Sequence, residues 1–401
     1  MARSFGLVQL AFAGATAAFG SSALAQVERP TGETPVPPQA PPVTLPMPGL
    51  TGPLVANTHP TRVNGGPLGD IYITGVLSGL GLAQDHQALG DTSTRGDVSN
   101  GQIFVQKIDG PIQFFIQAGG YSIPALGTAY VRAEDVVGLT YGVVPQAFIK
   151  LAPSSHFNVM VGKLPTLAGA EYTFTFENMN IDRGLLWNQE NAVNRGVQAN
   201  YSSGPITLSV SLNDGYYSGR YNWLSGLISY AVTPRDTLTA VAMGNVGQTP
   251  RADFATPLLQ NNSQLYNLIY THSAGPLTLT PYLQYTHVPA NPRLGIPAGA
   301  STYGAALLVK YALAPEFSLA GRAEYIASSG SLAAGTPSLV YGPGSRAWSL
   351  TFTPTYQRGV FFARAEVAYV TASNIASGFG FGANGDRNSQ ARAAVEMGVL
   401  F

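Results

Sequence analysis

The chain has 401 residues, of which 45% are hydrophobic and only 10% are charged. An ordinary soluble domain carries about 25% charged residues, so this chain must cover its surface in another way. The 21 basic and 21 acidic side chains cancel, which argues against the strong positive field of a nucleic-acid-binding protein. The sequence holds no cysteine, which excludes disulfides and cysteine metal sites, and 46 glycines with 29 prolines argue against a helix-rich enzyme.

Residues 1–25 have the pattern of a secretory signal peptide. Arg3 precedes an apolar, alanine-rich run, and Ala23-Leu24-Ala25 before Gln26 has the small residues of a cleavage site. The apolar run is shorter than the roughly 20 residues of a membrane-spanning helix, which argues against an anchor. We therefore expect export through the Sec pathway.

Residues 26–67 form a proline-rich stretch with eight prolines between Pro35 and Pro53. Such a composition favours an extended, polyproline-like conformation and does not pack a core. We expect a flexible periplasmic tail. It could be an ordinary disordered leader, a spacer or a partner-binding segment.

Residues 68–401 alternate apolar with small or polar side chains, which is typical of β-strands with one apolar face. The runs are about ten residues long, the length that a tilted strand needs to cross a bilayer, whereas strands of soluble sandwiches are shorter. The pattern predicts an all-β fold, a transmembrane antiparallel up-and-down β-barrel of about 16 strands. The candidate strands lie near residues 71–82, 98–109, 111–122, 142–151, 156–164, 192–201, 204–214, 223–232, 236–246, 264–272, 276–287, 302–313, 316–326, 347–357, 359–370 and 389–401.

Short and long connections alternate between these strands, as in bacterial outer-membrane barrels, whose short turns face the periplasm. Pro281 and Pro354 each remove a hydrogen-bond donor from a predicted strand, and we expect a β-bulge at each. Aromatic residues near the ends of the apolar faces are expected at the membrane interfaces. They are Trp223, Tyr285, Tyr325, Trp348, Tyr356 and Tyr369.

The few charges within the predicted strands fall on the polar phase, which a barrel turns toward its lumen. They are Lys310, Arg322, Glu324, Arg364, Glu366, Arg392 and Glu396. We expect them to line the wall of a watery lumen, where they either brace the wall or select the solute. The apolar phase then faces lipid, and we expect no large core.

The connection near residues 165–191 is the longest and most charged one, and it is the third long loop on this strand count. By analogy with general porins, we expect it to fold inward and narrow the channel, so that its charges form a constriction that filters ions by sign. The alternatives are a cap on the outer mouth or a latch to a neighbouring subunit. The candidate constriction residues are Glu171, Glu177, Asp182, Arg183, Glu190 and Arg195.

The stretch GKLPTLAGAEYTFTFENMNIDRGLLWNQENAVNRGVQANY, from Gly162 to Tyr201, resembles the OmpL-like β-barrel porin family of Gram-negative bacteria. The resemblance implies an outer-membrane channel for small hydrophilic solutes and ions, and it brings no catalytic motif. The C-terminal Phe401, in phase with Val399, Met397 and Val395, looks like the signal that the barrel-assembly machinery reads. We also expect a homotrimer by analogy with sixteen-stranded porins, with outer-membrane lipid around it.

Two other classes of function compete with a channel. A barrel enzyme would need a histidine beside a nucleophile or acid at the outer rim, and only His86 and His287 fall near predicted outer loops. No histidine spacing indicates a metal site, so we expect no metal and no cofactor. A structural or adhesive barrel with a closed lumen would fit eight strands better than sixteen.

Overall fold

The computed structural model describes Leu45, Leu50 and residues 52–401. The predicted signal peptide, and the predicted tail up to residue 51 apart from Leu45 and Leu50, lie outside the described residues. Everything below concerns the unit that begins at Pro42.

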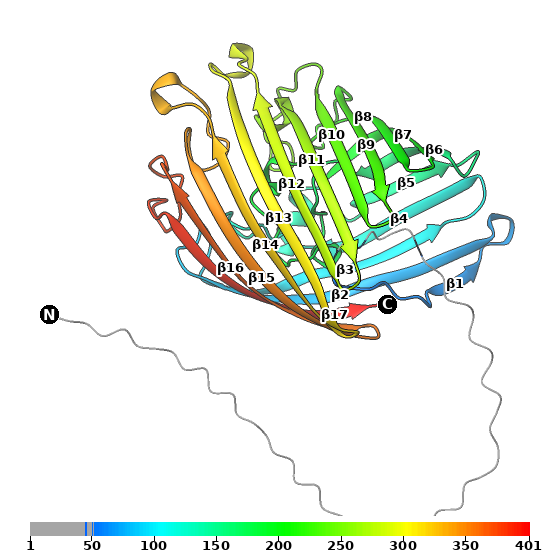
Figure 1. Cartoon of the computed structure of the whole chain (residues 1–401). Helices are drawn as coiled ribbons and strands as arrows, with labels where there is room; N and C mark the ends of the chain where they lie inside the picture. Colours follow the sequence, from blue (N-terminus) through cyan, green and yellow to red (C-terminus); the bar gives the residue numbers. More distant parts are fainter. Residues whose placement is uncertain (1–44, 46–49, 51) are drawn as a thin grey trace, which may run out of the picture. The chain divides into compact units, whose positions relative to one another are not determined.

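Seventeen strands form one antiparallel sheet, and sixteen of them, β2 to β17, close into a barrel through the pairing of β17 with β2 (Figure 1). This confirms the predicted all-β class and the strand number. The strands are β1 (Thr61–Asn64), β2 (Asp70–Gln84), β3 (Thr94–Lys107), β4 (Ile112–Tyr121), β5 (Gln146–Leu151), β6 (Phe157–Pro165), β7 (Val193–Ser203), β8 (Ile206–Asn213), β9 (Trp223–Thr233), β10 (Asp236–Asn245), β11 (Gln264–Ala274), β12 (Leu277–Val288), β13 (Ala300–Ala314), β14 (Phe317–Ser328), β15 (Arg346–Arg358), β16 (Phe361–Ser373) and β17 (Ser389–Leu400).

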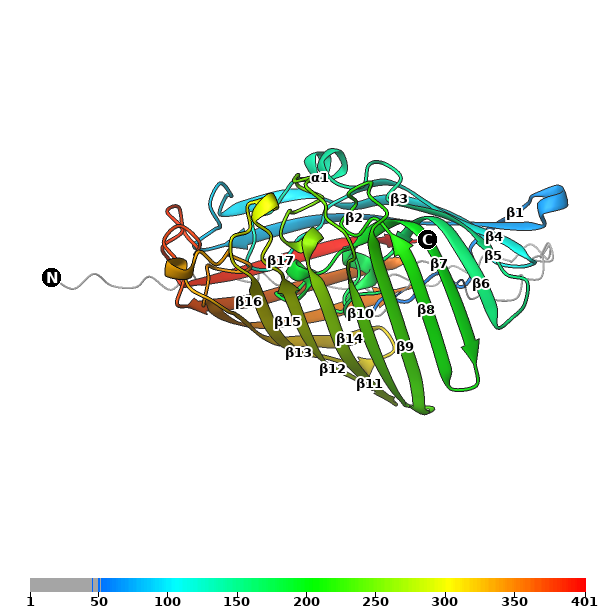
Figure 2. The ribbon, with the colours of Figure 1, turned by 90° about the horizontal axis from the view of Figure 1, so that it is seen from above.

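Every barrel strand pairs with its neighbour in sequence, so the connections fall on two rims. Two-residue turns join β7 to β8, β9 to β10 and three later pairs on one rim, whereas the other rim carries long loops such as residues 122–145 and 166–192. Helical turns occur mainly in the long loops: α1 (Ala133–Leu139), which lies beside β3 and β4 (Figure 2), and the 3-10 turns η1 (Gly66–Leu68), η2 (Thr175–Glu177), η3 (Trp187–Gln189), η4 (Gln260–Asn262), η5 (Pro292–Leu294) and η6 (Leu332–Ala334). No helix of the described residues has the length and hydropathy that crossing a membrane requires.

Side chains alternate between the two faces of the wall, as the sequence predicts. On β17, Val395 and Met397 are exposed on the outside, while Arg392 and Glu396 are buried on the inside. Trp348, Tyr356 and Tyr369 are exposed on the outer face as expected. Trp223 is a correction, because it is fully buried inside the barrel, where its ring packs edge-on against Tyr216.

The two strand prolines do not form the predicted bulges. Pairing of β11 with β12 continues from Ile269↔Tyr282 to His272↔Leu279 without a change of register across Pro281. Pairing of β15 with β16 likewise keeps its register on both sides of Pro354. Each proline therefore interrupts the ladder on one side of its strand without adding a residue to it.

The barrel contains a sizeable apolar core, which corrects the expectation that none exists. One buried cluster joins inner-face residues of β11 to β16, such as Ile269 and Leu308, to Met179, Leu185 and Leu186 of a long loop. A second cluster packs Phe104 and Phe115 of the wall against Phe174 and Phe176 of the same loop. The inner face is thus apolar wherever a loop covers it.

Part of the predicted tail belongs to the folded unit. Thr61–Asn64 forms β1 and pairs with Asp70–Ile73 at the start of β2. Before β1, Leu54 is 3% exposed and packs in the second apolar cluster. The predicted boundary at residue 68 therefore lies within structured chain.

Gly162 of β6 has a φ of +142°, a conformation that L-residues rarely adopt. A Cβ at this position would overlap the carbonyl oxygen of Ala147 on the neighbouring strand. We predict that Gly162→Ala lowers the yield of folded barrel, measured as the heat-modifiable band on a gel. Gly226→Ala is the matched control, since its Cβ would lie 3.8 Å from the nearest backbone oxygen. Equal yields for the two variants would contradict the prediction.

Candidate functional site

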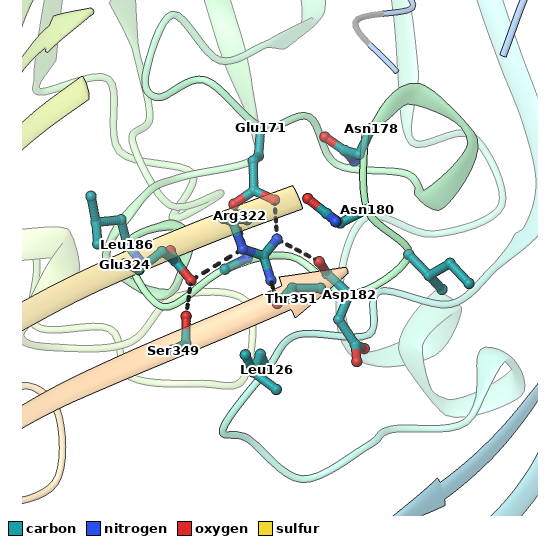
Figure 3. Close-up of polar contacts among 12 residues, drawn as sticks. Leu126, Glu171, Asn178, Asn180, Asp182, Leu186, Arg322, Glu324, Ser349 and Thr351 are labelled. Carbon is teal, nitrogen blue, oxygen red and sulfur yellow. Dashed lines mark hydrogen bonds and ion pairs between the residues drawn. The ribbon is translucent and has the colours of Figure 1, made fainter. Parts of the chain in front are cut away.

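Residues 166–192, which we call the inner loop, join β6 to β7 and lie against the inner face of the barrel wall. Charged side chains of β14, β16 and β17 project inward and bond to the backbone and side chains of the inner loop. Figure 3 shows these contacts for Arg322 and Glu324 of β14. The inner loop is the centre of the candidate site because it occupies the lumen.

Arg322 of β14 links the wall to the inner loop. Its Nη1 donates to Glu171 Oε1 at 2.6 Å and to the carbonyl oxygen of Asp182 at 2.7 Å, and its Nε donates to Glu324 Oε2 at 3.1 Å (Figure 3). Its Nη2 donates to the hydroxyl of Thr351 on β15 at 3.2 Å. One guanidinium thus bonds to two carboxylates, to a carbonyl oxygen of the inner loop and to the adjoining strand.

Glu324 and Glu366 accept hydrogen bonds from the backbone of the inner loop. Leu186 N donates to Glu324 at 3.2 Å, while Ile181 N and Asp182 N donate to Glu366 at 2.5 and 3.0 Å. A loop inside a barrel must find partners for its backbone N–H groups, because an unpaired buried donor is costly. The wall carboxylates supply those partners.

Arg364, Glu396 and Arg392 hold the remainder of the inner loop. Arg364 of β16 pairs with Glu396 of β17 and donates to the carbonyl oxygens of Asn178 and Thr175 at 3.0 and 2.9 Å. Glu396 also accepts from the hydroxyl of Thr175 at 2.7 Å. Arg392 lies 3.2 Å from Asp182.

Six of the seven predicted wall charges therefore do not face open water. Arg322, Glu324, Arg364, Glu366, Arg392 and Glu396 are at most 3% exposed. The alternation places them on the inner phase, but it carries no information about what covers them. Lys310 is the exception, since it is only half-buried and lines two cavities.

The six predicted constriction residues do not form one exposed ring. Glu171, Glu177, Asp182, Arg183 and Glu190 are all buried within the packing of the inner loop. Arg195 lies apart from them on β7, where it pairs with Asp214 at 2.7 Å and stacks on Tyr217. Within the described residues, the Arg183 guanidinium has no hydrogen-bond partner, and it lies 5.5 Å from the ring centre of Trp187.

Burial changes the protonation of the loop charges. It raises the pKa of Glu177 to about 8 and raises that of Glu190 well above its usual range. Burial also lowers the pKa of Arg183 to about 10. Glu177 is therefore mostly protonated at neutral pH, and its carboxyl accepts a hydrogen bond from Phe174 N at 3.0 Å.

Sequence reasoning missed the residues that complete these contacts. Ser349, Thr351 and Thr353 of β15 bond to the wall charges, and Asn180 of the inner loop donates to Thr353 at 2.7 Å. A run of hydroxyls on the phase shared with the charges was the available signal. The contact of Phe174 and Phe176 with the wall leaves no periodic signal in the sequence.

Open space remains beside the inner loop. A cavity of about 390 Å³ separates Ala170, Tyr172 and Met179 from β10 to β13, and hydroxyls line much of its wall. They belong to Thr239, Thr271, Ser273, Thr278 and Thr280. The described residues contain no cluster of three or more side chains able to hold a metal ion.

Comparison with known proteins identifies the family. Residues 70–401 match the family described as "Putative beta-barrel porin-2, OmpL-like". The chain belongs to this porin family. A comparison with curated proteins yields no match.

Solved outer-membrane proteins share this porin's fold at low sequence identity. OmpF of Salmonella typhi, solved as a complex with daunomycin, is 12% identical, with a TM-score of 0.55 over 85% of this chain and 100% of that one. The outer-membrane channel DcaP of Acinetobacter baumannii is 11% identical, with a TM-score of 0.55 over 83% and 97%. OmpT of Vibrio cholerae is 10% identical, with a TM-score of 0.54 over 83% and 98%.

We predict that Arg322→Ala loosens the inner loop. Removing the guanidinium leaves Glu171 and Glu324 buried without their cation, which costs about 3–5 kcal/mol for a buried pair. The measurement is the rate at which a protease cuts the inner loop in detergent-solubilised porin. Arg346→Ala is the control, because Arg346 is exposed at the start of β15. Equal cleavage rates for the two variants would rule out this anchoring role.

We further predict that alkaline pH destabilises the inner loop through Glu177. Between the ordinary pKa of a glutamate, about 4.3, and about 8, the folded porin holds a proton that the unfolded chain releases. The free energy of unfolding therefore falls as the pH rises through that window. The midpoint of thermal unfolding in detergent, measured at pH 5 and pH 9, should drop more for the wild type than for Glu177→Gln.

Glu134→Gln is the control for this experiment, because Glu134 is exposed in α1 and its side chain is 75% accessible. Its pH dependence should equal that of the wild type. If Glu177→Gln also keeps the full wild-type drop, Glu177 is not the titrating group.

Proposed function

We propose that this porin is an outer-membrane channel for the passive diffusion of small hydrophilic solutes and ions. The observation that carries the proposal is the hydroxyl-lined cavity beside the inner loop, within a barrel of sixteen strands. Side chains fill an eight-stranded barrel, whereas sixteen strands leave room for water. Threonine and serine hydroxyls replace part of the hydration shell of a polar solute without holding it strongly.

The inner loop narrows this channel by its bulk. Glu171 and Asp182 of the loop pair with Arg322 and Arg392 of the wall, and Arg364 and Glu366 of β16 bond to the loop backbone. These contacts fix the loop in the lumen. Solutes then pass through the cavity that remains between the inner loop and β10 to β13. The sequence analysis predicted an electric field across a constriction of loop charges. We propose instead a rigid constriction whose open side carries hydroxyls.

The proposal also includes export through the Sec pathway, cleavage after residue 25 and a periplasmic rim of short turns. In this orientation the long loops face the outside, and the apolar outer wall faces membrane lipid. The barrel-assembly machinery would read Phe401, whose N donates to Gly75 O at 2.9 Å and whose carbonyl accepts from Gly75 N at 2.8 Å. Assembly into a homotrimer is part of the same proposal.

A structural or adhesive barrel is the alternative from another class, and a barrel enzyme is a weaker one. Asp85 and His86 lie 3.8 Å apart in the loop between β2 and β3, where both side chains are exposed and each bonds to the backbone of β17. A structural barrel would have to close the hydroxyl-lined cavity. A conductance measurement separates the two readings.

The purified mature chain should give discrete conductance steps in a planar lipid bilayer. The same preparation, unfolded by heat before reconstitution, is the control for contaminating channels. A silent bilayer, with a protein that still shows heat-modifiable migration on a gel, would overturn the channel proposal. Liposomes that contain the porin should also swell in small neutral sugars, which tests diffusion of uncharged solutes independently.

A further inference from the structure

Two cavities inside the barrel meet at Lys310. The hydroxyl-lined cavity of about 390 Å³ lies beside the inner loop, and a second cavity of about 610 Å³ opens toward the rim of short turns. Lys310 of β13 lines both of them. A solute that moves along β10 to β13 and leaves by the short-turn rim passes this side chain.

The Lys310 ammonium carries a charge that no carboxylate balances. Within the described residues, it makes no ion pair, and its Nζ donates to the carbonyl oxygen of Gly52 at 3.3 Å. The other six wall charges are all buried under the inner loop. Lys310 is thus the wall charge that acts on the open passage.

The wall opposite Lys310 is formed by the chain that precedes β1, which we call the N-terminal segment (residues 52–60). Its Gly52 N donates to the carbonyl oxygen of Glu177 in the inner loop at 3.2 Å. Val55 exchanges two hydrogen bonds with the side chain of Gln357, at 2.7 and 2.9 Å, and Leu54 is buried. These contacts hold the segment across the short-turn end of the lumen.

Other ionisable groups near the second cavity do not neutralise the charge of Lys310. Glu316 lines the cavity in the turn between β13 and β14, where it lies 3.5 Å from Arg358 and accepts from the hydroxyl of Tyr356. His59 lines it from the N-terminal segment. The acidic group at the mouth is thus paired, while the cation at the junction is not.

We propose that Lys310 and the N-terminal segment form the selectivity filter of this porin and that the filter favours small anions, such as carboxylates. A lysine beside a narrow passage attracts anions and repels cations, and partial exclusion of water strengthens the effect. The segment narrows the passage, and its Gly52 carbonyl orients the ammonium. The inference rests on the proposed channel function and adds its solute class.

The direct test is the reversal potential of single channels in a KCl gradient. Wild-type porin should prefer chloride, and Lys310→Glu should lower the chloride-to-potassium permeability ratio by at least about fivefold, which corresponds to about 1 kcal/mol. Lys310→Gln should fall between the two. A wild-type preference for potassium, or an unchanged ratio in Lys310→Glu, would overturn the filter.

Lys150→Glu is the matched control. Lys150 also lies on the inner phase, but on β5, where it lines a separate cavity of about 190 Å³. It should leave the ratio near the wild-type value, and an equal shift would show a general charge effect and overturn the assignment to Lys310. Absence of any conductance from folded wild-type porin would refute the channel function itself, which distinguishes the two failures.

The cysteine-free sequence allows a second test. A Lys310→Cys variant should react with a small sulfonate-bearing thiol reagent, and the negative charge should shift the reversal potential toward cation preference within the same experiment. Lack of reaction in an open channel would show that position 310 lies outside the passage.

The segment is tested by Gly52→Leu, because a Cβ there would overlap the backbone of Asn178. Displacement of the segment should raise the single-channel conductance and weaken the anion preference. Gly138→Leu in α1, where a Cβ would meet nothing within 4 Å, is the control. Unchanged conductance and selectivity in Gly52→Leu would overturn the role of the segment.

Discussion

Burial of ionised side chains inside the barrel is the constraint on which the arrangement depends. A carboxylate or guanidinium removed from water is costly unless ionic and hydrogen-bonding partners surround it. Arg322 and Arg364 meet this demand by bonding to the wall and to carbonyl oxygens of the inner loop at once. The loop is therefore seated in one position, since a shift of it would break several charged contacts together.

The apolar packing acts in the same direction and explains the composition. The hydrophobic residues divide between an outer face that meets lipid and an inner core that the loop completes, as Phe174 and Phe176 illustrate. Few charges are needed on either face. The charges on β14, β16 and β17 lie where the backbone of the inner loop needs hydrogen-bond partners. The low charge content of the chain therefore reflects the packing of the interior as well as the lipid-facing surface.

The sequence allowed the barrel to be predicted because strand alternation is a local signal. The bulge that was predicted at Pro281 was wrong, because pairing of β11 with β12 keeps its register on both sides of the proline. The seating of the inner loop could not be predicted, since its contacts join residues such as Glu171 and Arg322 that are about 150 positions apart. Alternation tells which way a side chain points, but not whether water or protein meets it there, and so it did not separate Lys310 from the buried charges.

The closure of the barrel has a consequence for folding. The last strand pairs with the first barrel strand, and Phe401 exchanges two backbone hydrogen bonds with Gly75. The seam thus joins the first and the last strand of the barrel, so its contacts connect residues far apart in the sequence. Contacts of such high order form slowly and late. The barrel therefore keeps an open edge until β17 pairs with β2.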